Sequence, residues 1–273
     1  MECSDFGGVV VAPVPRPGKP RRAGVTMVID KGLGRAETED FLTCAGPYVD
    51  ILKLGFGTAL LYSPEWLRSK IECAKRHNVL VYPGGTLLEL AVYQGKGEAF
   101  VERVAELGFT AVEISEGTIE LDTATRKRLI MQGVSCGLAV LSEVGKKDTR
   151  RVFDVVQAAE AILADLDTGA LWVIVEGRDS GRGVGVYDEH GHIRADVVDA
   201  LMERVGHVDR LMWEAPRTHQ QNEWLQRFGP SVNLGNVQPP DVISLEATRR
   251  GLRGDTLKSY VAAKEPLAFR RNL

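Results

Sequence analysis

The stretch Gly137-Leu-Ala-Val-Leu141, followed by Glu143-Val-Gly-Lys-Lys147, decides the fold of this chain. An apolar run ends there on a charged cluster, and Leu171-Trp-Val-Ile-Val175 followed by Glu176-Gly-Arg-Asp-Ser-Gly181 repeats the pattern. A strand buried on both faces reads as a nearly continuous apolar run, which is typical of parallel sheets. In a parallel barrel, the loops after the strands build the active site at one open end. The two clusters therefore indicate strand ends that deliver charged side chains to one site.

Apolar runs of this kind alternate with amphipathic segments along the whole chain. Helical patterns are predicted over Pro64 to His77, 98–107 and 150–166, with Ser63 as the N-cap of the first. Eight β/α units favour a closed (β/α)8 TIM barrel of the α/β class over an open sheet. The strands are expected near residues 25–30, 48–54, 79–82, 109–114, 136–142, 171–176, 209–214 and 231–235.

An open doubly wound sheet that binds a dinucleotide is the alternative fold. Its G-x-G-x-x-G fingerprint has to follow the first strand. Gly32-Leu-Gly34 follows that strand, but Glu37 occupies the third glycine position, and neither Gly55-Phe-Gly57 nor Gly181-Arg-Gly183 completes the motif. The sequence therefore argues against a nicotinamide or flavin enzyme.

The regular pattern predicts one catalytic domain over residues 23–264. Residues 1–22 are rich in proline and arginine, so we expect a flexible, solvated tail there, and 265–273 form a C-terminal tail. The chain has 273 residues, 44% of them apolar, and a net charge of −3. This balance favours neither nucleic acid nor a membrane surface as a partner. Scattered cysteines and the lack of a long apolar stretch predict a cytoplasmic protein.

Charged side chains at the predicted strand ends point to a metal and to an anionic substrate. Glu143, Glu176 and Glu214 follow neighbouring strands, and carboxylate oxygens are the ligands that Mg²⁺ prefers. The lysines and the arginine beside them exceed what structural pairs require, so a small anion is the natural partner. The alternative is that some of these groups are ion pairs buried in the barrel mouth.

A phosphate site is predicted late in the chain. Barrels often hold phosphate in the loops after strands seven and eight, where this chain has Asn233-Leu-Gly-Asn236 and then Arg253. A solvated C-terminal helix face is the alternative for the arginine-rich part. His190 and His192 predict a turn rather than a zinc site, because no third ligand has suitable spacing. Gln221 either caps a helix or touches substrate.

Together these motifs resemble the phosphosulfolactate synthase family over about residues 21 to 257. Each motif alone is short, and the specificity lies in the ordered set. The matching stretches are Thr26-Met-Val-Ile-Asp-Lys-Gly32, Lys53-Leu-Gly-Phe-Gly-Thr58, Pro83-Gly-Gly-Thr86, Glu113-Ile-Ser115, Glu143-Val-Gly-Lys-Lys147, Glu176-Gly-Arg178, Ser180-Gly181, Glu214-Ala-Pro216, Gln220-Gln221, Val232-Asn-Leu234 and Leu252-Arg-Gly-Asp-Thr256.

The resemblance implies a magnesium-assisted lyase that adds sulfite to phosphoenolpyruvate and gives (2R)-phospho-3-sulfolactate. It also implies a homo-oligomer, with a trimer as one form. In methanogens this reaction opens coenzyme M synthesis, and elsewhere it can supply sulfolactate. A plant heat-stress protein belongs to the same family. The alternatives are therefore a phosphoenolpyruvate enzyme with another nucleophile, or a non-catalytic stress-related protein.

The expected reaction assigns a role to each charged group. Lys147 is the predicted general acid at C2, and Arg178 would hold sulfite or carboxylate. The remaining expected contacts are Lys146, Lys53 and Lys31 for anions, Ser115 and Gln221 for substrate, Asn233, Asn236 and Arg253 for phosphate, and Glu143, Glu176 and Glu214 for Mg²⁺ with Asp30 behind them.

Three positions depart from the family pattern. Glu116 stands where the family usually has Asp, Asp179 where it has Glu, and Phe56 where it has Trp. The first two keep the charge but change the reach of the side chain by one methylene each. If both face one pocket, the two changes could compensate.

Overall fold

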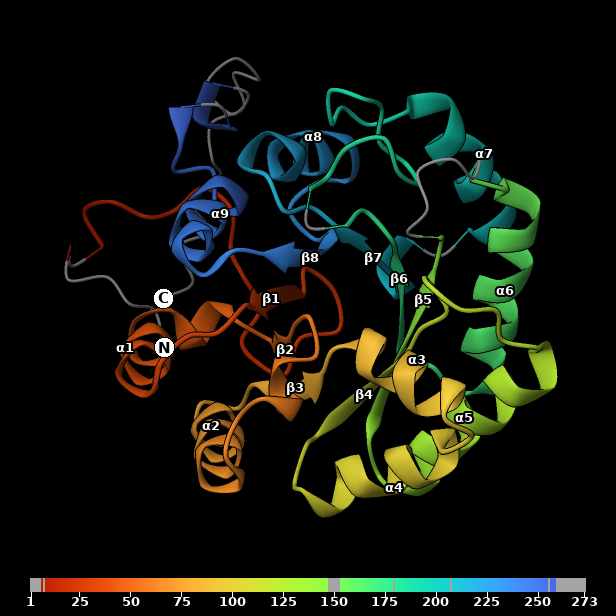
Figure 1. The fold of residues 1–273 in the computed structure, drawn as a ribbon. Coiled ribbons are helices and arrows are strands. Elements are labelled where there is room, and N and C mark those ends of the chain that lie inside the picture. The colour runs from red at the N-terminus through yellow and green to blue at the C-terminus, as the bar shows by residue number, and fades with distance from the viewer. Residues whose placement is uncertain are drawn as a thin grey trace.

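A nearly closed ring of parallel strands forms the centre of the protein (Figure 1). The computed structural model describes residues 6, 8–146, 153–178, 180–206, 208–254 and 256–258. The hydrogen-bonded order is β3-β2-β1-β8-β7-β6-β5-β4, and every pairing is parallel. The predicted (β/α)8 barrel is therefore confirmed. The strands are β1 Thr26–Asp30, β2 Ile51–Leu54, β3 Leu80–Pro83, β4 Ala111–Ile114, β5 Ala139–Val144, β6 Trp172–Val175, β7 Leu211–Glu214 and β8 Asn233–Val237.

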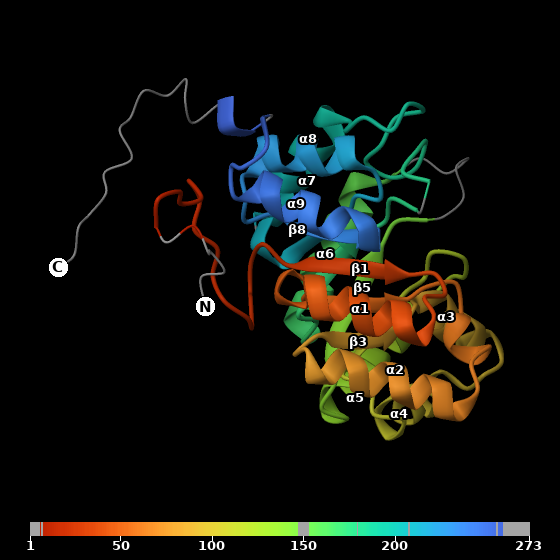
Figure 2. The same cartoon turned by 90° about the vertical axis from the view of Figure 1, so that its left-hand side faces the viewer.

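Helices surround this ring and return the chain to the start of each next strand (Figures 1 and 2). The predicted start of α2 is confirmed, because the Ser63 hydroxyl accepts a hydrogen bond from the Trp66 amide and Pro64 is the first helical residue. No helix in the described ranges is both long and apolar enough to cross a membrane. The helices are α1 Arg35–Ala45, α2 Pro64–Arg76, α3 Gly85–Tyr93, α4 Gly97–Glu106, α5 Thr123–Ser135, α6 Val155–Thr168, α7 Ala195–Val205, α8 Thr218–Phe228 and α9 Val242–Arg249.

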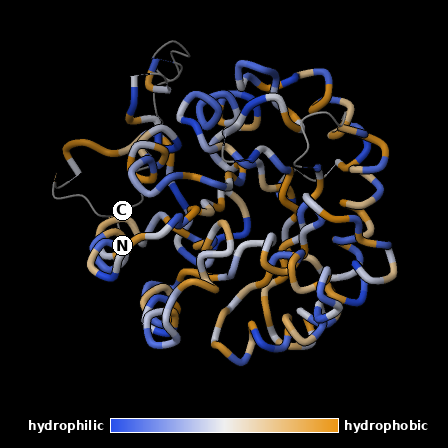
Figure 3. Tube along the Cα trace, in the orientation of Figure 1, coloured by the Kyte–Doolittle hydropathy of each residue, from blue (hydrophilic) through white to orange (hydrophobic). Residues whose placement is uncertain are grey.

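Two apolar layers stabilise the barrel. The larger layer packs the outward faces of the strands against the helices, and Trp213 stacks there on Trp224 with ring centroids 4.2 Å apart. The smaller layer fills the barrel interior and includes Met27, Tyr82 and Ile174. Because side chains alternate across a strand, the strands from β1 to β7 each serve both layers. Hydrophobic stretches accordingly mark the strands, and hydrophilic ones recur along the outer helices (Figure 3).

The segment before β1 packs against the end of the barrel where the strands begin (Figure 2). Arg16 pairs with Glu246 at 3.2 Å, and Arg21 pairs with Asp50 at 3.0 Å, all with nearly buried side chains. The Lys19 ammonium donates to three backbone carbonyl oxygens. The expectation that basic residues keep this segment solvated is therefore wrong for these three side chains. Buried carboxylates and carbonyls at this end need cationic partners, and the segment supplies them.

Candidate active site at the barrel mouth

A cavity of about 260 Å³ lies at the carboxyl ends of the strands. This is the end of a barrel that carries catalysis in characterised barrel enzymes. Its lining brings together side chains from seven of the loops and strands that sequence analysis singled out. The lining residues are Ile29, Lys53, Gly55, Phe56, Gly84, Gly85, Thr86, Glu113, Thr118, Glu176, Arg178, Glu214 and Asn236.

Lys53 holds the centre of this site. Its ammonium lies 3.1 Å from Glu113, 3.3 Å from Glu214 and 3.8 Å from Glu143. Burial by itself lowers the pKa of Lys53, but the surrounding carboxylates, Glu113 foremost, raise it well above its usual value. Lys53 therefore stays cationic near neutral pH. This suits it to charge neutralisation and not to proton donation.

Glu113 is a member of this cluster that sequence analysis left without a role. Its Oε2 accepts a hydrogen bond of 2.7 Å from the Tyr82 hydroxyl, and its Oε1 accepts one of 3.0 Å from the Gly85 amide. A β-carbon at Gly85 would lie 2.2 Å from Glu113 Oε1, so glycine is required there. The signal in the sequence was a lone charge inside the apolar run Ala111–Ile114, since a buried charge needs a partner.

A second buried chain of polar groups lies beside Lys53. The Ser115 hydroxyl lies 2.6 Å from Glu89 Oε1 and 2.8 Å from Glu143 Oε1. A hydroxyl carries one proton, so it cannot donate to both carboxylates. Glu89 comes from α3 and was not predicted as a site residue, because it sits in a helical segment and not at a strand end.

The opposite side of the mouth carries the groups that suit a metal. Glu176 Oε1 accepts from the Arg178 amide at 2.5 Å, and Glu214 Oε2 accepts from the Gly177 amide at 3.0 Å. Both carboxylates line the cavity, as does Asn236. Asn236 Oδ1 is buried and has no hydrogen-bond partner among the described residues. Two carboxylates and an orphaned amide oxygen form a donor set that fits Mg²⁺.

The backbone at this side is held in an uncommon conformation. Arg178 has φ 58°, and Asn236 has φ 52°. Phe56, on the far side of the cavity, has φ 56° and is 57% exposed. Positive φ in residues other than glycine costs free energy and concentrates at functional sites. Lys31 contacts this rim, with its ammonium 5.6 Å from the Phe56 ring centroid.

Three predicted site residues hold the scaffold together. Both Asp30 oxygens are used inside the protein: Oδ1 accepts from the Gly32 and Leu33 amides, and Oδ2 accepts from Lys70. Gln221 donates to the Ala215 carbonyl in the loop after β7.

Asn233 is the first residue of β8. Its hydrogen bonds go to backbone groups of Val25, Asp209 and Leu211, at the starts of the neighbouring strands. The structure thus separates Asn233 from Asn236.

Arg253 also lies away from the mouth. It follows α9, whose last residue Arg249 donates to the carbonyls of Pro230 and Val232 just before β8. Arg253 itself donates to the Ser244 hydroxyl in α9. Helices of a barrel run antiparallel to its strands, so the end of α9 reaches the amino-terminal end of the barrel. The fold therefore does not bring Asn233 and Arg253 together with Asn236 at the mouth.

The loop after β5 carries the remaining lysines. Lys146 donates to the carbonyls of Glu116 and Ile119 and pairs with the Glu116 carboxylate at 3.5 Å. It lines a neighbouring pocket at the rim and not the central cavity. Lys147, the predicted general acid, and Asp179 lie outside the described residues.

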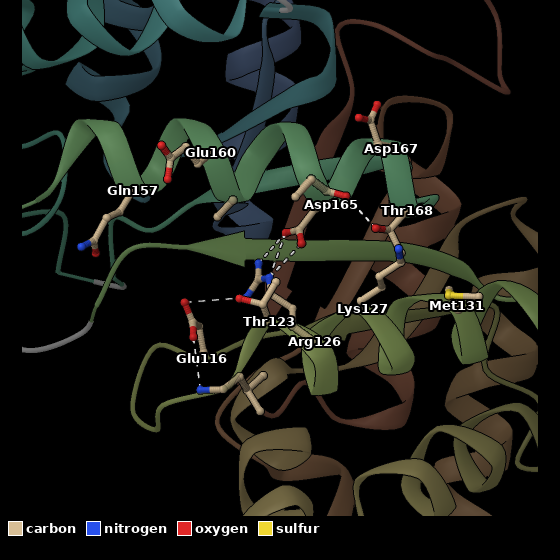
Figure 4. A pocket seen from close by; sticks show the side chains of 13 residues that line it. Glu116, Thr123, Arg126, Lys127, Met131, Gln157, Glu160, Asp165, Asp167 and Thr168 are labelled. Atoms are coloured by element: carbon tan, nitrogen blue, oxygen red, sulfur yellow. Dashed lines mark hydrogen bonds and ion pairs between the residues drawn. The ribbon is translucent and has the colours of Figure 1, made fainter.

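A larger groove, of about 780 Å³, lies outside the barrel between α5 and α6 (Figure 4). Arg126 and Asp165 form a buried pair at its floor, with the two closest contacts at 2.5 and 2.9 Å. Glu116 lies 3.9 Å from Arg126, on the side nearer the loop after β4. The groove lies among helices outside the ring of strands, and its buried arginine is already paired with Asp165, so it is a weaker candidate for catalysis than the mouth.

Comparison with known proteins points to one family. Residues 14–255 match the model of the (2R)-phospho-3-sulfolactate synthase (ComA) family. The chain is 44% identical over 245 residues to the phosphosulfolactate synthase of Methanothermobacter thermautotrophicus, covering 89% of this chain and 95% of that protein. It is 37% identical over 243 residues to the phosphosulfolactate synthase of Bacillus subtilis, covering 88% and 95%.

More distant relatives share less of the sequence. Protein HEAT-STRESS-ASSOCIATED 32 of Arabidopsis thaliana is 24% identical over 261 residues, covering 86% of this chain and 88% of that protein. Among solved structures, 3-hexulose-6-phosphate synthase from Salmonella typhimurium superposes with a TM-score of 0.53 at 16% identity, covering 87% of this chain and 99% of that one. At this identity, the structural match shows a common fold only.

Proposed function

Because the chain belongs to the (2R)-phospho-3-sulfolactate synthase family, we propose that its barrel mouth adds sulfite to C3 of phosphoenolpyruvate, giving (2R)-2-O-phospho-3-sulfolactate. Family membership indicates an enzyme. The observation that carries the proposal is the constellation around Lys53: a buried, permanently charged lysine amid carboxylates at the catalytic end of a barrel. Such groups are costly unless they are paired or used.

In the proposed reaction, the sulfur lone pair of sulfite forms a bond to C3 of phosphoenolpyruvate. The C2–C3 π electrons move to C2 and into the carboxylate, and a proton is then added at C2 on one face. Arg178 faces the cavity with a guanidinium that suits a carboxylate or sulfite oxygen pair. Lys147 remains our predicted proton donor. Lys53 holds the carboxylates in place and keeps their negative charge from repelling the substrate.

Magnesium fits the side of the mouth that is formed by the ends of β6, β7 and β8. Glu176, Glu214 and the Asn236 amide oxygen would hold it, and all three line the cavity. A bound Mg²⁺ would supply electrostatic stabilisation of the negative charge that develops on the substrate carboxylate. Glu143 touches Lys53 and Ser115 from deeper in the barrel. We therefore propose that it positions Lys53 and does not contact the ion.

We further propose a homo-oligomer. Leu60 and Leu61 are adjacent and strongly exposed beside the mouth, after β2. Exposed neighbouring apolar side chains favour association. Light scattering after gel filtration measures the mass directly, and a monomer at micromolar concentration would contradict this part of the proposal.

The decisive experiment incubates the protein with phosphoenolpyruvate, sulfite and Mg²⁺ and follows phosphorus NMR with mass spectrometry. A new phosphorylated species that carries the added mass of sulfite would establish the activity. Thermal shift measurements with phosphoenolpyruvate and Mg²⁺ separate the alternatives, because a bound ligand stabilises the folded state. A stabilised protein that forms no adduct would indicate another nucleophile, whereas no stabilisation would indicate a non-catalytic protein.

A further inference from the structure

Three potential metal ligands meet on the outside of the barrel, beside the loop that joins β6 to α7. His192 belongs to this loop, and His219 and Glu223 lie one turn apart on the same face of α8. One ligand atom from each residue lies within 4.8 Å of the other two. His192 Nδ1 is 2.7 Å from Glu223 Oε1, and the two imidazole rings have centroids 5.6 Å apart.

We propose that His192, His219 and Glu223 form a binding site for Zn²⁺ or a similar divalent transition metal. Two imidazoles and one carboxylate suit Zn²⁺, Co²⁺ or Ni²⁺, whereas Mg²⁺ prefers oxygen ligands alone. Sequence spacing predicts no such site near His192, because the remaining ligands lie in a helix that follows the next strand. The fold brings them together.

The geometry requires only a small adjustment. Ligands that bind zinc at about 2.0–2.2 Å in a tetrahedron lie roughly 3.3–3.5 Å apart. The observed separations reach at most 4.8 Å, so each atom has to move little. The His192 side chain is 62% exposed and that of Glu223 is 29% exposed, which leaves room for this rotation. The Gly191 carbonyl oxygen, 3.2 Å from His219 Nε2, or a water molecule would complete the tetrahedron.

The local charge also favours a cation. Asp188 Oδ1 lies at this turn and accepts hydrogen bonds from the amides of His190 and His192. It adds a second carboxylate close to the proposed ligands. Among the described residues, His192, His219 and Glu223 contact one another and backbone groups, and a bound ion could replace these contacts without breaking an ion pair to a lysine or arginine.

A second group with similar residue types provides a contrast. Glu39, Cys73 and His77 also lie close enough to share an ion. There, however, Arg76 Nη2 lies 2.7 Å from Glu39 Oε2 and already neutralises the carboxylate. Arg76 thus occupies the only carboxylate of this group, whereas the magnesium site proposed at the mouth has two carboxylates. We therefore assign no metal to this group, and it serves as an internal comparison.

The proposed site would fasten the β6–α7 loop to α8. Gln220 already donates to the carbonyls of Gly181 and Gly191, and Arg217 donates to that of Ser180. A metal would add a third tie at the outer end of the loop. The loop includes Arg178, beside the mouth, so metal binding would limit the motion of the segment that carries this side chain.

The test is titration of Zn²⁺ into the metal-free full chain, followed by calorimetry, with Co²⁺ absorption spectra as a second readout. It needs no substrate, so its outcome is independent of the proposed function. We expect His219→Ala and Glu223→Gln each to weaken the Zn²⁺ affinity at least tenfold. His190→Ala is the matched control, because it removes an exposed imidazole from the same turn and should leave the affinity unchanged. Circular dichroism verifies that each variant is folded.

Each outcome decides the proposal. Zinc that raises the melting temperature of the parent protein but not of His219→Ala, together with tetrahedral Co²⁺ bands lost in that variant, supports the site. Equal zinc affinity in the parent, His219→Ala and Glu223→Gln proteins overturns it. So does a parent protein that binds no zinc below millimolar concentration.

Discussion

Replacing Lys53 by methionine should destabilise the protein strongly, because this single ammonium neutralises a cluster of buried carboxylates. It lies within 3.1–3.8 Å of Glu113, Glu214 and Glu143, and those three side chains are at most 1% exposed. Methionine keeps most of the side-chain volume and removes the charge. The perturbation is therefore electrostatic and leaves no large cavity.

The expected loss is about 3–5 kcal/mol in the free energy of unfolding at pH 7, the range found when one partner of a buried pair is removed. For a domain of this size, this corresponds to a fall of roughly 6–20 °C in the melting temperature. The loss should shrink toward pH 5. In the variant the clustered carboxylates repel one another without a neutralising cation, and protonation at lower pH relieves this repulsion.

Urea denaturation at pH 7 and pH 5 measures both effects. Lys75→Met is the control, since Lys75 forms an exposed pair with Glu72 and should contribute less than about 1 kcal/mol. The double variant Lys53→Met/Glu113→Gln should recover part of the loss. A change below about 1 kcal/mol in Lys53→Met at pH 7, or a loss that does not depend on pH, would refute the electrostatic account.

Other substitutions test other parts of the molecule. Glu89→Gln should cost less than Glu89→Ala, which should lose about 1–3 kcal/mol in urea denaturation, because only the amide can still bond Ser115. Burial lowers the pKa of Lys19 to about 8. The unfolded state therefore holds more protons between about pH 8 and pH 10.4, and thermal melts should show the parent gaining stability over Lys19→Met as the pH rises through that window. Arg178→Ala and Arg178→Gly should both raise the KM for phosphoenolpyruvate at least tenfold. The glycine variant should be about 1 kcal/mol more stable than the alanine variant, because glycine adopts the positive φ of this position without strain.

The strands were predictable because the barrel buries them on both faces. Ala111–Ile114 and Trp172–Val175 are buried at every position. Such runs require apolar residues throughout, and the turn to charged residues after each run marks the mouth. All eight predicted strands are confirmed in order. The metal and anion roles of the residues after them stay predictions.

The ends of the strands were harder to place, and β8 shows why. The predicted strand over 231–235 puts Asn233 at its centre and Asn236 just past its end, but β8 begins at Asn233 and runs to Val237. A strand rises about 3.3 Å per residue, so a shift of a few residues moves a side chain from the mouth to the opposite end. Asn236 remains at the mouth and Asn233 does not.

Contacts between distant segments were beyond the reach of spacing arguments. Glu89 reaches Ser115 from a helix, and His192 meets Glu223 from a long loop. Neither contact leaves a periodic signal, because each depends on how a helix packs on the barrel. The contact between Glu113 and Lys53 differs from these two, because the sequence carries a signal for it. A lone carboxylate in an apolar strand requires a buried cation, so its pairing with Lys53 could have been inferred.

The balance of charges at the mouth supports the proposed metal. The described cavity lining has two cations, Lys53 and Arg178, and three carboxylates, Glu113, Glu176 and Glu214. Lys53 is already shared among carboxylates, which leaves Arg178 as the cation of this lining for an incoming anion. A phosphate ester that also carries a carboxylate would meet a negative site, and like charges in a weakly screened cavity repel strongly. A divalent cation held by Glu176 and Glu214 reverses this balance, so substrate binding should depend on it.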